Sequence, residues 1–307
     1  MQIYLPVADL PVDIFLVLAM GLAVGFISGL FGIGGGFLMT PLLIFIGVPP
    51  GVAVASVASH IAASSCSGAI SYWRRNAIDV SLALMLLAGG FLGTAVGVWL
   101  FSLLRVLNQL DLTIGLSYVV LLSIVGMLMI IESVRVIIRE RQGKPVVLRR
   151  GGSHTWVHGL PMKMRFKRSK IYVSVIPIWV IGFVIGFIGA IMGIGGGFIL
   201  VPMLIYFLRV PSATVIGTSM VLTLITMAAA TFMHAITNHL VDAVLALILM
   251  VGGVIGAQFG TRAGQSMKGE WLRLSLGLLV LAVGLRFAFE LVVQPDTLYS
   301  IRQTGGG

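Results

Sequence analysis

Long apolar segments without charge follow one another along most of this chain, separated by short polar turns. Two examples are "VSLALMLLAGGFLGTAVGVWLF" at 80–101 and "LTIGLSYVVLLSIVGMLMII" at 112–131. Each is long enough to cross a hydrocarbon layer about 30 Å thick as an α-helix. The segments are uniformly apolar and do not alternate, which favours helices over a β-barrel. The pattern predicts an all-α polytopic membrane protein with about eight full spans and two shorter half-helices.

The hexapeptide GIGGGF interrupts the apolar pattern at 32–37 and again at 193–198, and a proline follows each time, at Pro41 and Pro202. Three consecutive glycines weaken a helix, each by about 1 kcal/mol relative to alanine. Backbone groups released inside a membrane need a partner from protein, water or a ligand. We therefore expect two helices broken at these glycines, each restarting as a half-helix, with the prolines as hinges or turns.

The two halves of the chain match one another. Residues 25–45 match residues 186–206 at a constant offset, and residues 78–97 match residues 241–260 at an offset two residues longer. Such an internal repeat is common among secondary transporters. We expect three parts: a first transmembrane repeat at 1–138, a basic loop at 139–170 and a second transmembrane repeat at 171–307.

Positive charge is concentrated between the halves, in "RERQGKPVVLRRGGSHTWVHGLPMKMRFKRSK" at 139–170. A basic loop between membrane spans is cytoplasmic by the positive-inside rule, and it is no sign of nucleic-acid binding. Contact with anionic lipid headgroups and a solvated linker are both open readings of this loop. The halves are either parallel or inverted. The inverted arrangement places more Lys and Arg on the side of the loop and is favoured.

The restarted half-helices carry the candidate binding groups. The first-turn amides of a helix bear a partial positive charge and bind anions. Two such ends, one from each half, would hold a small anion without a buried Arg or Lys. The glycines assigned to this site are Gly34, Gly35, Gly36, Gly195, Gly196 and Gly197. Close helix packing is the alternative for these triplets, and it is the expected role of two GxxxGxxxG faces: Gly89, Gly93 and Gly97, and Gly252, Gly256 and Gly260.

Hydroxyl groups and one histidine add polarity near the breaks. Ser56, Ser59 and His60 lie in the segment that follows the first break, and Thr218 and Ser219 follow the second. We assign all five to the substrate path, although small hydroxyl residues also join membrane helices without further function. An intramembrane histidine is a candidate for proton coupling; a neutral ring bonded to a carbonyl is the alternative.

Three further residues are expected to have structural roles. Asp79 and Asp242 each precede a long apolar segment, the usual place of a helix N-cap. His234 lies near the end of a predicted helix and is expected at the membrane interface.

The motifs "GLFGIGGGFLMTP" and "AIMGIGGGFILVP", with the "ID" and "VD" helix starts, resemble the TauE/SafE sulfite-exporter family of membrane permeases. The "GTS" at 217–219 matches that family's motif, whereas the first half reads "VAS" at 54–56. The resemblance covers both halves but not the central loop. It implies that the glycine breaks and the following Ser and Thr residues line a path for a small sulfur-containing anion such as sulfite or an organosulfonate.

Together these features predict a permease in a bacterial inner membrane, bound to a small anionic substrate and coupled to protons or another ion. The single cysteine excludes a thiolate metal cluster, and no cofactor is expected. An intramembrane enzyme is disfavoured because HExxH, GxSG and paired intramembrane aspartates are missing from the sequence. A membrane scaffold or assembly protein without transport remains the other alternative.

Overall fold

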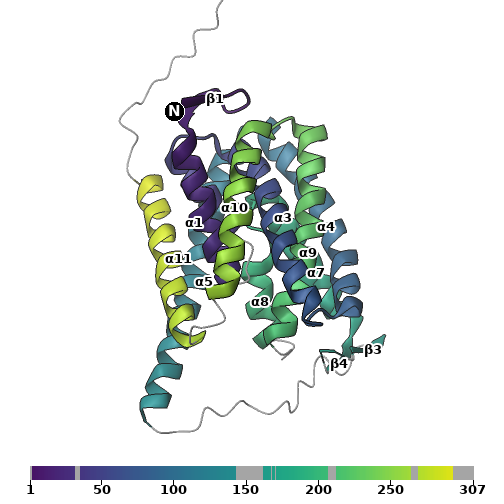
Figure 1. Ribbon diagram of the computed structural model, residues 1–307. Helices are drawn as coiled ribbons and strands as arrows, with labels where there is room; N and C mark the ends of the chain where they lie inside the picture. Colours follow the sequence, from purple (N-terminus) through teal and green to yellow (C-terminus); the bar gives the residue numbers. More distant parts are fainter. Residues whose placement is uncertain are drawn as a thin grey trace, which may run out of the picture.

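The computed structural model describes residues 2–31, 35–142, 162–166, 168–169, 171–206, 212–263 and 269–292. These residues form a bundle of roughly parallel and antiparallel helices with two small β-hairpins at its ends (Figure 1). In the described ranges, seven helices are long and apolar enough to cross a membrane, and α11 contributes a shorter apolar stretch, Leu274–Phe289. The predicted all-α polytopic fold is confirmed.

The first half begins with a hairpin and continues with helices only. Its elements are β1 (Gln2–Leu5), β2 (Leu10–Asp13), α1 (Ile14–Phe31), α2 (Gly36–Phe45), α3 (Pro50–Arg74), α4 (Val80–Val106) and α5 (Leu110–Arg141). The strands pair antiparallel, with Leu5 opposite Leu10.

The second half repeats this order and adds one π-helical turn. Its elements are β3 (Lys163–Phe166), β4 (Ile171–Ser174), α7 (Val175–Met192), α8 (Gly197–Tyr206), α9 (Ser212–Met233), η1 (His234–Asn238), α10 (Ala243–Ala263) and α11 (Gly269–Val292). Most of the predicted basic loop, 139–170, lies outside the described residues; α5 extends into it at one end and β3 at the other.

The first long helix of each half packs against a helix of the other half. α1 packs against α10, and α7 packs against α4. Glycines make both contacts close: a Cβ added at Gly93 would collide with the carbonyl oxygen of Phe183, and one added at Gly256 with that of Leu22. Such backbone-to-backbone approach is the purpose of small residues on membrane helices. The prediction that the two GxxxGxxxG faces serve packing is confirmed.

The contacts at the helix ends give the directions of the central helices. The Asp79 amide, just before α4, bonds to Thr218 near the start of α9, and Ser102 near the end of α4 bonds to Asn238 after α9, so these two helices are parallel. The Asp242 amide, just before α10, likewise bonds to Ser56 near the start of α3. Since α3 and α4 are joined by a short turn and run antiparallel, α3 and α10 run opposite to α4 and α9 (Figure 1).

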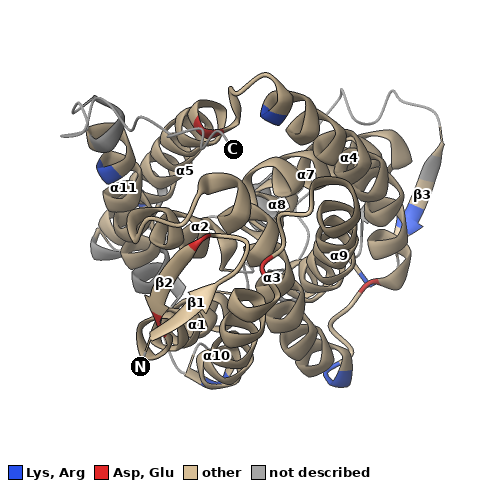
Figure 2. Ribbon diagram, turned by 90° about the horizontal axis from the view of Figure 1, so that it is seen from above, with Lys and Arg blue, Asp and Glu red and all other residues tan. Residues whose placement is uncertain are grey.

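Apolar side chains cover the outside of the bundle as well as its core. Most of the described bundle carries neither acidic nor basic residues when it is viewed along the helices (Figure 2). Large side chains such as Phe91, Trp99 and Leu116 are exposed on α4 and α5. An outer face of this kind suits a lipid surround, whereas a water-soluble protein rarely exposes so continuous an apolar surface.

Candidate functional site

Both predicted breaks are present where the structure describes them. Gly35 adopts φ +68° and precedes α2, and Gly193 adopts φ +65° and ends α7. Gly195 and Gly196, at φ +69° and +31°, separate Gly193 from the start of α8. Positive φ is disfavoured for residues with a side chain and easily adopted by glycine. The glycines therefore unwind the two helices, while Gly34 lies outside the described residues.

The two breaks face one another in the centre of the bundle. Phe37 and Phe198, which directly follow the glycine triplets, stack with ring centroids 4.6 Å apart and planes 11° apart. A Cβ added at Gly36 would collide with the Gly193 carbonyl oxygen. Ile61 of α3 borders both breaks, beside Gly36 and Gly195. The structure thus brings the predicted glycines of the two halves together, enclosed by protein.

Side-chain donors occupy the carbonyl groups that the second break releases. Four side chains, from α2, α5, α9 and η1, donate to backbone carbonyl oxygens here. Two bonds are of ordinary length, Tyr118 Oη to Met192 (2.6 Å) and His234 Nε2 to Ala190 (3.0 Å). Two are long, Thr223 Oγ1 to Gly195 (3.4 Å) and Thr40 Oγ1 to Gly193 (3.5 Å). A released carbonyl inside a membrane is costly without such a partner. These four carbonyl oxygens, at or just before the break, therefore already have side-chain donors.

Several backbone amides at the breaks, unlike these carbonyl groups, have no hydrogen-bond partner among the described residues. In the first turn of α2, the amides of Leu38 and Met39 donate to the carbonyl oxygen of Gly35. In the first turn of α8, the amides of Ile199 and Leu200 donate to the carbonyl oxygen of Gly196. Among the described residues, no acceptor bonds to the amides of Gly36, Phe37, Gly195 or Phe198. Unpaired donors at two helix N-termini, beside paired acceptors at the second break, form a site with positive potential and no formal charge.

The predicted hydroxyl residues are engaged in bonds of their own. Ser56 Oγ accepts from the Asp242 amide at 3.0 Å, and Thr218 Oγ1 accepts from the Asp79 amide at 3.2 Å. These are matched contacts between opposite halves. Two further hydroxyls donate within their own helices: Ser59 to the Ser56 carbonyl (2.5 Å) and Ser219 to the Ile216 carbonyl (2.8 Å).

Both aspartates cap a helix, as predicted, and each also holds a hairpin. Asp242 Oδ1 accepts from the amides of Val244 and Leu245 at the start of α10, and its Oδ2 accepts from Val7 between β1 and β2. Asp79 Oδ1 accepts from the Leu82 amide, and its Oδ2 accepts from the Ser169 amide and hydroxyl, between β3 and β4. Each carboxylate therefore ties a helix start to the hairpin that precedes α1 or α7.

His60 is fully buried between α3 and α10. Its Nδ1 lies 2.7 Å from the carbonyl oxygen of Leu249, and a Cβ at Gly253 would collide with the ring. Because the carbonyl can only accept, we assign the proton to Nδ1, which leaves Nε2 as an acceptor in the neutral ring. Nε2 has no partner within the described part of the chain.

His234 differs from the prediction. It is fully buried, its Nδ1 accepts from the side-chain amide of Asn238, and its ring meets Phe101 edge-on at 4.6 Å. The interfacial placement was wrong because the π-helical turn η1 continues α9 inside the protein and directs this ring at the second break. Pro41 and Pro202 lie within the bounds of α2 and α8, so each follows its break by part of a helical turn.

Sequence reasoning missed the donors that stabilise the second break. Tyr118 lies in the middle of an apolar segment, and a phenol there nearly always has a buried partner. The sequence therefore indicated that Tyr118 has a buried partner, but it did not indicate that this partner is the carbonyl group of Met192 in the other half. Thr40 is a lone hydroxyl in an apolar half-helix and carried the same weak signal.

The chain is similar to known proteins over most of its length. The family model "Sulfite exporter TauE/SafE" matches residues 17–287. A probable membrane transporter protein of Xylella fastidiosa (strain 9a5c) is 31% identical over 283 residues, covering 89% of this chain and 94% of the relative. The probable membrane transporter protein YunE of Bacillus subtilis (strain 168) is 24% identical, covering 90% and 97%. The Sulfite exporter TauE/SafE family protein 3 of Arabidopsis thaliana is 30% identical over 110 residues, which is 36% of this chain and 22% of that protein. No solved structure matches with significance.

Proposed function

The chain belongs to the sulfite exporter TauE/SafE family, and from this premise and the geometry of the two breaks we propose that it is a secondary transporter for a small sulfur-containing anion such as sulfite or an organosulfonate. It is an integral membrane protein whose relatives are named as membrane transporters. The substrate and its binding site are the part that we propose.

One observation supports an anion more than any other substrate. At the second break four carbonyl groups have side-chain donors, while the amides of Gly195 and Phe198 have no acceptor among the described residues. At the first break the amides of Gly36 and Phe37 are in the same state. Oxyanions bind such donors readily, whereas a cation would need free carbonyl oxygens.

The proposed binding set combines the glycines of both halves. Gly35, Gly36, Gly195 and Gly196 supply the backbone, and Gly34 and Gly197 adjoin them. His60 supplies an acceptor at Nε2 for a proton that accompanies the anion. We also assign Ser56, Ser59, Thr218 and Ser219 to the path. Of these, Ser56 and Thr218 fix the starts of α3 and α9 to the residues that precede α10 and α4.

Matched contacts support an inverted duplication of the two halves. Asp79 and Asp242 occupy corresponding positions, and Ser56 corresponds to Ser219, the neighbour of Thr218. The hydroxyl groups of Ser56 and Thr218 each accept a hydrogen bond from the backbone amide of the aspartate in the other half. The opposite directions of α3 and α9 agree with inverted halves. We place the loop 139–170 on the cytoplasmic side of a bacterial inner membrane, in contact with anionic headgroups. Rocking of one half against the other would expose the breaks to each side in turn.

The test is flux through the purified full chain in liposomes. Vesicles loaded with sulfite, sulfate, thiosulfate or methanesulfonate are diluted into anion-free buffer with and without a pH gradient. We expect saturable efflux of at least one sulfur oxyanion. A protein that is folded and inserted but moves none of them would contradict the proposal and favour a scaffold role.

A further inference from the structure

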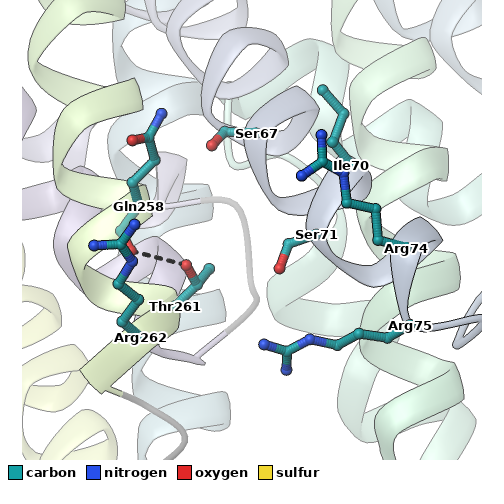
Figure 3. Close-up of a pocket in the computed structure, with 8 residues that line it drawn as sticks. All are labelled: Ser67, Ile70, Ser71, Arg74, Arg75, Gln258, Thr261 and Arg262. Carbon is teal, nitrogen blue, oxygen red and sulfur yellow. Dashed lines mark hydrogen bonds between the residues drawn. The ribbon is translucent and has the colours of Figure 1, made fainter.

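A basic pocket lies where α3 and α10 end, away from the glycine breaks (Figure 3). Its volume is about 460 Å³. Arg74 and Arg262 come from the last turns of the two helices, and Arg75 is the C-cap of α3. The side chain of Arg75 extends across the opening toward α10 (Figure 3).

The guanidinium groups of this pocket are open to a ligand. None of the described residues that line the pocket is acidic, and within the same part of the chain Arg74, Arg75 and Arg262 have no hydrogen-bond or ion-pair partner. By contrast, Arg105 at the end of α4 and Arg168 between β3 and β4 donate to carbonyl oxygens. Three unpaired guanidinium groups in one cavity repel one another and are stabilised by an anion, which they grip with paired N–H donors.

A row of polar side chains leads inward from this pocket. Ser71 and Ser67 line the pocket, and Ser64 and His60 continue the same face of α3 at intervals of three or four residues. His60 touches Gly253 of α10, the helix that forms the other wall. The row ends at the buried Nε2 of His60, which has no partner in the part of the chain that the structure describes, and the next residue, Ile61, borders both breaks. The polar face of α3 thus runs from the pocket to His60, whose next neighbour along the helix, Ile61, contacts the breaks.

We propose that this pocket is the entry site for the transported oxyanion, which docks on Arg74, Arg75 and Arg262 before it moves along the seam between α3 and α10 to His60 and the breaks. The forked guanidinium geometry fits a sulfite or sulfonate head with several oxygens better than a halide. The inference rests on the proposed function for the identity of the ligand. The electrostatic character of the pocket is tested independently of transport.

The first test measures the potential inside the pocket. In a Cys66→Ala background, Ser71→Cys places a thiol at the pocket wall, and its rate of modification is measured with anionic and cationic methanethiosulfonate reagents in the full-length protein. We expect the anionic reagent to react about tenfold faster at low salt, and added sulfite or methanesulfonate to slow it. Ser67→Cys provides a second thiol should the first variant fold poorly. Equal rates with both reagents would overturn the inference.

The second test uses charge variants in the same background. The preference for the anionic reagent should be lost in a triple variant with Arg74→Gln, Arg75→Gln and Arg262→Gln. It should be kept when the same three residues are replaced by lysine, which preserves their charge. Arg135→Gln on α5, outside the pocket, is the matched control. In liposomes the Gln variants should raise the half-saturating anion concentration about tenfold with little change in maximal flux. Unchanged half-saturation would overturn the entry site, and absence of flux in the wild-type chain would overturn the proposed function instead.

Discussion

Phe37 and Phe198 stack face to face, with ring centroids 4.6 Å apart, at the point where the two broken helices restart. Each ring is the first large side chain after a glycine triplet, and both are buried. The pair therefore joins the two half-helix N-termini through an apolar contact beside the amides that we assign to the anion. Any movement that separates the halves at this level has to part these rings.

The energy of this stack can be measured with a double-mutant cycle. Phe37→Leu and Phe198→Leu each remove one ring, and the interaction beyond simple burial is expected to be about 0.5–1.5 kcal/mol. Chemical unfolding of the two single variants and the double variant in detergent gives the coupling. If the single effects simply add, the rings do not stabilise one another in the resting structure.

Closing either glycine break should stop transport. Valine at Gly196 would place its Cβ against Ile185 and force a residue with a side chain into positive φ, and Gly35→Val meets Ser28 under the same backbone strain. We expect membrane-inserted protein without flux, measured by liposome efflux and by size-exclusion chromatography. Gly51→Ala is the control, since its nearest neighbours are the ends of flexible leucine side chains at 3.2 Å. Normal flux in both valine variants would contradict the assigned site.

Two hydrogen bonds join the halves, from the Asp242 amide to Ser56 and from the Asp79 amide to Thr218, and we expect them to contribute equally to stability. Ser56→Ala leaves the Asp242 amide without its acceptor, and Thr218→Val does the same to the Asp79 amide. A buried donor left unpaired costs about 1–3 kcal/mol. Ser59→Ala, whose hydroxyl donates within its own helix, should cost less. Thermal unfolding in detergent compares the three, and a larger loss in Ser59→Ala than in Ser56→Ala would contradict the ranking.

His60→Ala tests proton coupling. The ring donates from Nδ1 to Leu249 and leaves Nε2 open, so removal of the ring takes away the proton acceptor of the proposed path. We expect the dependence of flux on external pH to flatten in this variant. The exposed His239, replaced by alanine, serves as control and should keep the wild-type profile. A pH profile unchanged by His60→Ala would remove this residue from the mechanism.

The orientation of the chain can be read from two matched turns. Asn76 follows α3 and Asn108 follows α4; both are exposed and both adopt positive φ, at 53° and 54°. Cysteine at position 76 should react only with reagents that reach the cytoplasmic side, and cysteine at position 108 only from the opposite side, in Cys66→Ala whole cells. The reverse pattern would overturn the cytoplasmic placement of the central loop.

Sequence alone determined the features that arise from neighbouring residues. Charge-free segments of about twenty residues predict membrane helices whatever their partners. Glycine triplets unwind a helix through local backbone freedom, which is why the break at 193–196 was predictable. Asp79 and Asp242 cap their helices through bonds within three residues. The match between halves also predicts which positions correspond to one another.

Only the tertiary structure decided which groups meet. The Ser56 bond to Asp242 spans 186 positions, and the Tyr118 bond to Met192 spans 74. The burial of His234 and the grouping of Arg74 with Arg262 depend on the crossing of helices from opposite halves. That crossing is set by how closely glycine faces let the backbones approach, a distance that no local pattern encodes.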